Sequence, residues 1–386
     1  MLAWIAPLIV FGIVVFVHEL GHFLAAKAVG VYAPRFSIGF GKTLWKRRRG
    51  ETEYVIAALP LGGYVRLASK EDEATAFLEG GNENSAASAS PKDGWDPDAM
   101  IPFGPKPIPE NRWMESQSLW GKLLIMLAGV TMNLILGYLV LTGMFIGYGQ
   151  PYLSTRADSL LANRPAAQAG MHAGDSILTV NGEPLKDWDA LLRKVGASAG
   201  VPLALGVIRD GARHEFTVTP VGEEGLNPET GKKETAGKIG IIGRAGSTRI
   251  PVGDAMAAGA RATAGMATSV LTSLKQLATR EVSAKELGGP IAIAQASVQA
   301  ARGGFEPLLL LIAFISINLA VFNLLPIPIL DGGQILIMLL EAAKGSPFSM
   351  KTREYVLKAG LGAILLLVAF VMYNDIRRLV QTLFGV

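Results

Sequence analysis

Two histidines and one glutamate near the amino terminus have the types and the spacing of a metal site. His18, Glu19 and His22 form the pattern H-E-x-x-H. On a helix, positions i and i+4 share a face, so both imidazoles can reach one metal ion while Glu19 stands beside it. Neutral imidazoles suit Zn²⁺, and a catalytic zinc ion takes three protein ligands and keeps one position open for water. The pattern therefore predicts a zinc site with a third ligand from elsewhere in the chain.

Hydrogen bonding inside a helical bundle is the alternative role for the same two histidines. Only 4 of the 386 residues are histidines, which makes a chance H-E-x-x-H improbable. The pattern also directly follows an uncharged segment, residues 1–17. Ionisable groups deep in an apolar helix are costly and are usually functional. These surroundings favour the metal site.

Asp331 is the candidate for the third metal ligand. It lies in the sequence N-L-L-P-I-P-I-L-D-G-G, residues 323–333. The two prolines prevent a continuous helix, and the backbone groups that they free must be satisfied internally or by water. A broken helix with a carboxylate suits the wall of a wet cavity. An aspartate at a helix end, at the membrane interface, is the alternative.

Long uncharged segments predict that these residues lie in membrane-spanning helices. The chain is 50% hydrophobic and only 18% charged, whereas roughly 25% is usual in soluble proteins. Residues 1–17, 123–149 and 307–330 carry no charge, and a spanning helix needs about 20 mainly apolar residues. Residues 359–374 reach this length if their helix begins near Tyr355. We therefore expect about four transmembrane helices.

The positions of Lys and Arg indicate the orientation of these helices. The connections at residues 27–49 and 344–358 are rich in Lys and Arg, and such connections lie in the cytoplasm. Both termini and residues 150–306 are then outside, although Arg377 and Arg378 in the tail point the other way. At about 1.5 Å per residue, the H-E-x-x-H pattern lies about 25 Å along a helix that enters from outside. The third span also enters from outside, so Asp331 reaches a similar depth, toward the cytoplasmic side.

Overall composition excludes some chemistry and some partners. The chain has no cysteine, so it has neither disulfides nor thiolate metal ligands. A basic rim facing membrane lipids accounts for the net charge of +4. Nothing in the sequence calls for a nucleic acid.

The chain divides into four expected regions. Residues 1–150 hold two spans and an extended stretch at 36–67, in which strands at 54–56 and 64–67 are expected on either side of a turn at 60–63. They also hold an acidic, Ser/Ala-rich insert at 69–111 that we expect to be flexible and cytoplasmic. Residues 151–222 have the composition of a small α+β module, with strands that meet at the Asp-Gly turn of positions 210–211. Residues 223–306 are expected to form a polar linker and amphipathic helices, and residues 307–386 the last two spans.

The motifs together resemble the site-2 protease family of intramembrane zinc metalloproteases, and most of all its bacterial regulator-of-sigma-E protease branch. The resemblance rests on H-E-L-G-H at 18–22, on N-x-x-P-x-P-x-L-D-G at 323–332 and on P-L-G-G-Y-V at 60–65. The module at 151–222 resembles a PDZ domain. The chain departs from relatives at A-G-V-T-M-N, residues 128–133, which lacks a frequent proline, and in having one PDZ-like module where some have two.

The resemblance implies a role for each motif residue. His18, His22 and Asp331 would hold zinc, and Glu19 would act as general base and then as proton donor. Asn323 would donate a hydrogen bond to the substrate or an intermediate, unless it only braces the broken helix.

The resemblance also implies a substrate-binding element at Gly62, Gly63 and Tyr64, where an unwound substrate would pair as a strand. An ordinary cytoplasmic hairpin is the alternative.

The implied activity is hydrolysis of peptide bonds in or near the transmembrane segments of single-pass membrane proteins. A pre-cut anti-sigma factor and signal-peptide remnants are candidate substrates, and the bacterial inner membrane is the implied location. A different hypothesis is a non-catalytic membrane scaffold whose PDZ-like module binds peptide tails, but a scaffold has no use for Glu19. A third is another H-E-x-x-H family with catalysis on the soluble side, where a Glu usually replaces Asp331 as third ligand.

Overall fold

The computed structural model describes residues 2–69, 109–226, 233–283 and 288–384. These residues form two units, one of residues 1–142 and 259–386 and the other of residues 143–258. Most of the insert expected at 69–111 lies outside the described residues.

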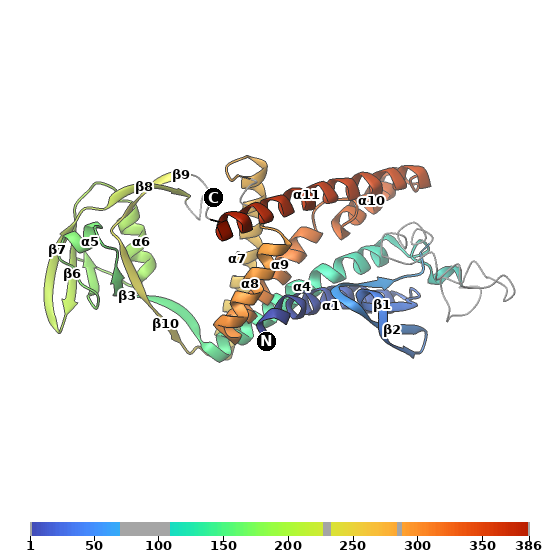
Figure 1. The fold of residues 1–386 in the computed structure, drawn as a ribbon, viewed down its shortest axis with the longest axis horizontal. Helices are drawn as coiled ribbons and strands as arrows, with labels where there is room; N and C mark the ends of the chain where they lie inside the picture. The colour runs from blue at the N-terminus through green and yellow to red at the C-terminus, as the bar shows by residue number, and fades with distance from the viewer. Residues whose placement is uncertain (1, 70–108, 227–232, 284–287, 385–386) are drawn as a thin grey trace. The chain divides into compact units, whose positions relative to one another are not determined.

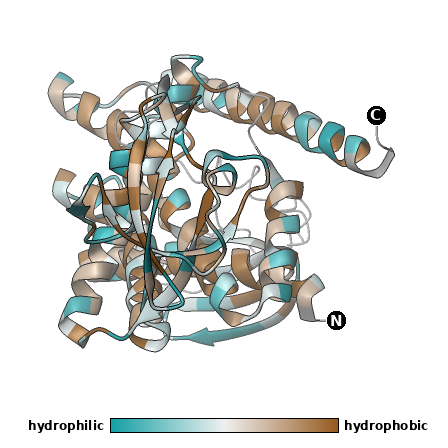
Figure 2. Cartoon of the chain, turned by 90° about the vertical axis from the view of Figure 1, so that its left-hand side faces the viewer, coloured by the Kyte–Doolittle hydropathy of each residue, from teal (hydrophilic) through white to brown (hydrophobic). Residues whose placement is uncertain are grey.

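Within the described residues, four helices are long and apolar enough to cross a membrane. They are α1 (Leu2–Val29), α4 (Leu119–Tyr148), α9 (Phe305–Asn323) and α11 (Met350–Phe384) (Figure 1). In Figure 2 the helix that leads to the C-terminus is mostly brown along its middle and turns teal toward its end, as expected for a span with a polar tail. The prediction of about four transmembrane helices is confirmed.

Helices α1 and α4 pack closely side by side (Figure 1) because a glycine lies between them. A Cβ atom at Gly21 would lie only 2.4 Å from the carbonyl oxygen of Ala128. Small residues allow such close contact between membrane helices. Val10 and Val14 of α1 are fully buried against Ile312 of α9, so the three helices share one apolar core.

The predicted break in the third apolar segment is present. Helix α9 ends at Asn323, and α10 (Asp331–Lys344) begins at Asp331. The two prolines between them cannot continue a helix. Two glycines then let the loop lie against the start of α10, since a Cβ at Gly332 or Gly333 would lie 2.3 Å or 2.0 Å from a loop carbonyl oxygen.

A small sheet next to α1 is formed by β1 (Arg35–Arg49) and β2 (Thr52–Arg66). Each long strand bends, so the pairing register divides the sheet into four segments. Their order is 43–49, 52–57, 35–38 and 63–66. The two β2 segments expected on either side of a turn at 60–63 therefore do not pair with each other. Residues 35–38 lie between them, which short-range turn signals cannot indicate.

The second unit has an α+β fold. Its elements are β3 (Gln150–Leu160), α5 (Pro165–Gln168), β4 (Ser176–Val180), β5 (Glu183–Pro184), α6 (Trp188–Gly196), β6 (Leu203–Arg209), β7 (Ala212–Val218), β8 (Val221–Leu226), β9 (Lys233–Lys238) and β10 (Ile241–Thr248). The main sheet has the order β10-β3-β4-β6-β7, with β5 paired to β4. Ile177, Leu191 and Leu205 are buried in the core between this sheet and α6. The predicted turn at Asp210 joins β6 to β7, with a positive φ of 48°.

Residues 223–248 differ from the polar linker that we expected to begin at 223. They contribute most of a β8–β9 ribbon and then β10, which pairs with β3 and so completes the sheet. The ribbon consists largely of glycine and charged residues, so it lacks the apolar alternation from which strands are predicted. The sheet therefore uses strands from both ends of the unit.

Two further helices follow, as predicted, at α7 (Val252–Ala278) and α8 (Pro290–Gly303). The buried carboxylate of Asp375, in α11, accepts hydrogen bonds from the backbone N–H groups of Gly289, Ile291 and Ala292. It thereby supplies hydrogen-bond acceptors for backbone N–H groups at the start of α8, which have no partner within the helix. A short turn, η3 (Glu110–Arg112), precedes α4.

Candidate metal centre

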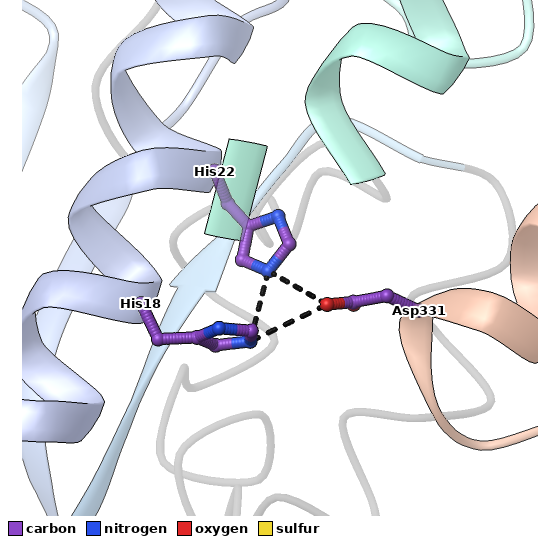
Figure 3. Close-up of side chains that lie close together, drawn as sticks. All are labelled: His18, His22 and Asp331. Atoms are coloured by element: carbon purple, nitrogen blue, oxygen red, sulfur yellow. Dashed lines mark hydrogen bonds and ion pairs between the residues drawn. The ribbon is translucent and has the colours of Figure 1, made fainter. Parts of the chain in front are cut away.

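The structure brings His18 and His22 of α1 together with Asp331 at the start of α10 (Figure 3). The Nε2 atoms of the two histidines lie 3.1 Å apart. Oδ2 of Asp331 lies 3.4 Å from Nε2 of His18 and 3.5 Å from Nε2 of His22. Both histidines are buried. A break in the helix is what allows a residue 309 positions beyond His22 to reach this depth with its side chain directed at α1.

This triangle fits a zinc ion. Zinc–ligand distances of about 2.0–2.1 Å in a tetrahedron place neighbouring ligand atoms about 3.3–3.4 Å apart. The observed separations of 3.1, 3.4 and 3.5 Å bracket that value. Oδ2 of Asp331 is also a buried oxygen with no hydrogen-bond partner in the described part of the chain. Two imidazole nitrogens and a carboxylate oxygen are zinc ligands in type as well as in position.

Backbone and side-chain groups of α4 orient the two imidazoles. Nδ1 of His22 donates a hydrogen bond to the carbonyl oxygen of Ile125 at 2.8 Å, which leaves Nε2 as the nitrogen that can bind metal. The amide of Asn133, fully buried, lies 3.4 Å from Nδ1 of His18. The sequence analysis assigned no role to Ile125 or to Asn133, although Asn133 is the last residue of the A-G-V-T-M-N sequence at 128–133. An amide side chain inside the uncharged segment 123–149 was a second signal for Asn133.

Gly129 of α4 forms the wall of the site. A Cβ atom there would lie 2.3 Å from Nε2 of His22 and 2.8 Å from Cε1 of His18. No other residue type leaves room for both rings. The absent proline at the next position, Val130, leaves α4 continuous from Leu119 to Tyr148.

Glu19 and the sheet meet on the other side of the site. A carboxylate oxygen of Glu19 accepts a hydrogen bond from the backbone N–H of Val65 at 3.1 Å. A Cβ atom at Gly63 would lie 3.4 Å from Cγ of Glu19 and 2.7 Å from the carbonyl oxygen of Ser37. The segment 63–66 therefore runs directly past Glu19. The sequence pointed to Gly63 but not to the N–H of Val65.

The remaining predicted residues lie nearby. Nδ2 of Asn323, a buried side chain, lies 3.1 Å from Nε2 of His18, so this amide faces the same centre. The ring of Tyr64 stacks on Phe40 with a centroid separation of 6.1 Å. Gly62 packs against the same Phe40 ring, where a Cβ would lie 2.3 Å from a ring carbon.

A sequence model of peptidase family M50 matches residues 6–367. The chain therefore belongs to this family, the site-2 proteases. Two relatives match along almost their whole length. The zinc metalloprotease RasP of Bacillus licheniformis is 31% identical over 97% of this chain and 99% of its own. The regulator of sigma-W protease RasP of Bacillus subtilis is 32% identical over 97% of this chain and 98% of its own.

The chain is thus a multi-pass membrane protein and a zinc metalloprotease, and the predictions of family, enzyme class and Zn²⁺ cofactor are confirmed. Among solved structures, the PDZ domain of an SdrC-like protein from Listeria monocytogenes matches 24% of this chain and 88% of its own, with 18% identity and a TM-score of 0.19.

Proposed function

We propose that this protein hydrolyses peptide bonds in or near the transmembrane segments of membrane proteins, at a zinc ion held by His18, His22 and Asp331. The observation that carries the proposal is the triangle of ligand atoms between α1 and α10, beside a strand edge that no other described strand pairs with. The name of the Bacillus subtilis relative, regulator of sigma-W protease, favours substrates that control sigma factors. A pre-cut anti-sigma factor fits this class, and signal-peptide remnants are the second candidate.

The chemistry divides between the metal and Glu19. Zinc lowers the pKa of the water that it binds and polarises a carbonyl group. Glu19 lies beside the ligand triangle, where its carboxylate can take a proton from water and pass it to the leaving amine. Asn323 faces the same centre from α9 and can donate a hydrogen bond to the carbonyl oxygen of the substrate.

The segment 63–66 supports a strand-addition mode of substrate binding. It pairs with residues 35–38 on one side, and in the described residues no strand pairs with its other side, which faces Glu19. A helical substrate hides its peptide bonds in its own hydrogen bonds. An unwound substrate that paired along residues 63–66 would present a peptide bond to the metal centre. It would also compete with Glu19 for the N–H of Val65, which would free the carboxylate for proton transfer.

The positive-inside rule favours a metal centre toward the cytoplasm and an α+β unit outside the inner membrane. In this arrangement the PDZ-like unit cannot supply a ligand or a base. We infer that it selects substrates, either by binding their peptide tails or by its bulk.

Glu19→Gln tests the proposed function. Glu19 is not a ligand, so the variant should keep zinc and fold normally, while cleavage of a transmembrane substrate by the purified protein in detergent falls by about 100-fold or more. Zinc is counted by metal analysis on the same sample. Near-normal cleavage by the variant would overturn the assignment. Unchanged peptide-tail binding without any cleavage, in wild type as well, would favour the scaffold hypothesis.

A further inference from the structure

The hairpin at the outer side of the small sheet carries a basic and apolar surface that the proposed proteolysis does not use. Residues 42–49 include five Lys or Arg. Apolar side chains on the same hairpin are exposed to an unusual degree, with exposed fractions of 67% for Leu44 and 48% for Trp45. Soluble surfaces rarely combine large exposed apolar side chains with a dense run of positive charge.

Four side chains of this hairpin line a shallow, open hollow of about 350 Å³. They are Trp45, Arg47, Arg49 and Tyr54. They share one face because alternate strand residues point the same way and because Arg47 pairs across the hairpin with Tyr54. Within the described part of the chain no carboxylate lies within ion-pair distance of Arg47 or Arg49. Their neighbour Lys46, by contrast, pairs with Glu53. Two guanidinium groups over one hollow, neither with a carboxylate partner among the described residues, favour a phosphate or carboxylate ligand.

Two contacts place the hollow next to the end of a membrane-spanning helix. Glu51, at the hairpin turn, pairs with Lys27 in the last turn of α1. The Tyr54 ring lies 5.9 Å from the ring of Phe23, also in α1. The turn is therefore at the level where α1 leaves the apolar layer.

The order of residues along the strand matches a lipid boundary. Leu44 and Trp45 come first and Arg47–Arg49 follow toward the turn, a rise of about 17 Å from Leu44 to Arg49. Trp favours the boundary between acyl chains and headgroups, and Arg the charged headgroup layer itself. A hollow that joins the two chemistries fits a lipid headgroup better than it fits a soluble anion.

Protection of an edge strand is the other role for such charges. Residues 43–49 form an outer edge of the sheet among the described residues, and Lys or Arg on an edge prevents unwanted pairing. For that role a charge at any position along the edge is sufficient. It does not need two Arg, a Trp and a Tyr on one face around a hollow.

We propose that the hollow of Trp45, Arg47, Arg49 and Tyr54 binds the phosphate-bearing headgroup of an anionic phospholipid. The two guanidinium groups hold the phosphate, and Trp45 lies against the upper acyl chain. The segments of the sheet run in the order 43–49, 52–57, 35–38, 63–66. A lipid bound to the first segment therefore anchors the whole sheet at the membrane surface and fixes the depth of the last segment, which lies beside Glu19. Lipid binding itself does not depend on the proposed proteolysis.

Fluorescence quenching tests the proposal on the full-length protein. The chain has no cysteine, so Leu44→Cys introduces one site for a bimane label beside the hollow. The protein is reconstituted in phosphatidylcholine vesicles with an equal mole fraction of brominated phosphatidylglycerol or brominated phosphatidylcholine. We expect about twofold stronger quenching by the anionic lipid. Arg47→Gln with Arg49→Gln should abolish this preference. Arg213→Gln with Arg244→Gln, an equal charge change at exposed sites of the other unit, should retain it.

Three results would overturn the proposal. One is equal quenching by the two brominated lipids in the otherwise unchanged protein. Another is a preference for the anionic lipid that survives in the Arg47/Arg49 double variant. If that variant folds poorly, Arg47→Gln and Arg49→Gln are tested singly, and a preference that survives in both has the same meaning. The third is loss of the preference when glycerol phosphate is added in solution, because the hollow would then be a site for soluble anions.

Discussion

Gly129 is not a metal ligand, but its lack of a side chain leaves the space that the rings of His18 and His22 need in order to bind zinc. Gly129→Ala should lower zinc affinity about tenfold or more, because the new methyl group would displace the His22 ring from its hydrogen bond with Ile125. Metal analysis after dialysis against a weak chelator measures the loss. Gly143→Ala is the matched control, since it lies in the same helix and a Cβ there has no neighbour within 4 Å. Equal zinc retention by both variants would contradict this prediction, because it would show that α4 can shift enough to accommodate a methyl group at position 129.

Asp331 is the only carboxylate in the ligand triangle. Asp331→Ala should leave zinc well below one ion per chain, because two imidazoles alone bind it weakly. Asp189→Ala removes an exposed aspartate of the second unit and should not change zinc content. A buried control such as Asp175 is unsuitable, since Arg209 pairs with it and the loss would disturb folding. Full zinc occupancy in Asp331→Ala would remove this residue from the site.

The backbone N–H of Val65 is the group that strand addition would use next to Glu19. Val65→Pro removes this N–H at a strand edge, where proline is tolerated. We expect cleavage to fall about tenfold, the equivalent of one hydrogen bond, with zinc retained. Val65→Ala keeps the N–H and should stay close to wild-type activity. If the Ala variant loses as much activity as the Pro variant, side-chain packing and not the N–H matters.

Among the elements, those with local signals were predictable and those with distant partners were not. The i, i+4 spacing of His18 and His22 and the prolines before Asp331 carry their meaning within a few residues. The four-segment order of the small sheet depends on residues 35–38 pairing with two segments at once, and no local pattern encodes that choice. The same holds for β10, which pairs with β3 across almost a hundred residues. The roles of Gly129 and Val65 could be recognised only in the folded chain, because Gly129 acts through the lack of a side chain and Val65 through its backbone N–H.

Glu51 joins three elements at the end of α1. It pairs with Lys27 of α1, and Arg112 donates two hydrogen bonds to it at 2.8 and 2.9 Å. The hydrogen bonds from Arg112, followed by the contact with Lys27, lower the pKa of Glu51 from its ordinary value of 4.5 to about 2. Arg112 also donates to the carbonyl oxygen of Gly30. The turn of the basic hairpin is thus tied to the helix that carries the zinc ligands.

This pKa sets the pH dependence of a Glu51→Gln variant. Because the folded-state pKa is depressed, the stabilisation is complete above pH 4.5 and is lost as the pH falls towards about 2. At pH 7 the variant should unfold a few degrees below wild type in detergent, and the difference should shrink at pH 3. Glu110→Gln, an exposed neighbour, should show no difference at either pH. A gap between wild type and Glu51→Gln that does not change with pH would mean that its ion pairs contribute nothing.

At the scale of the whole molecule, orientation determines which compartment reaches the metal centre. Ser346, between α10 and α11, should face the cytoplasm, and Ala212, in the β6–β7 hairpin, should lie outside. Single cysteines at these exposed positions can be labelled cleanly because the chain has none of its own. A membrane-impermeant maleimide should label Ala212→Cys in intact spheroplasts and Ser346→Cys only after the membrane is disrupted. The opposite pattern would invert the proposed topology.

The second unit can be removed as a whole because its two ends are paired. Gln150 of β3 lies opposite Thr248 of β10, so a short Gly/Ser linker can replace residues 151–247. Removal of residues 151–222 alone would leave β10 without its partner β3. If the unit selects substrates and takes no part in the chemistry, the shortened protein should keep zinc and cleave a short transmembrane peptide at a near-normal rate. It should also cleave membrane proteins with large outer domains, whereas the full-length protein should not.

Met171→Glu separates the two ways in which the unit could select. The short segments 169–171 and 177–178 would suit the wall of a peptide groove, and Met171 is buried there in the core of the unit, so a charge should distort such a groove at a cost in stability. Selection by peptide binding predicts a changed order of preference among substrates with different tails, measured in a competition assay. Selection by bulk predicts an unchanged order of preference. Thermal unfolding checks that the unit of the variant is still folded. If Met171→Glu does not fold, Leu178→Glu replaces it, because Leu178 is a more exposed strand residue. A shortened protein that folds, keeps zinc and cleaves no short peptide would contradict both, since the unit would then be needed for catalysis.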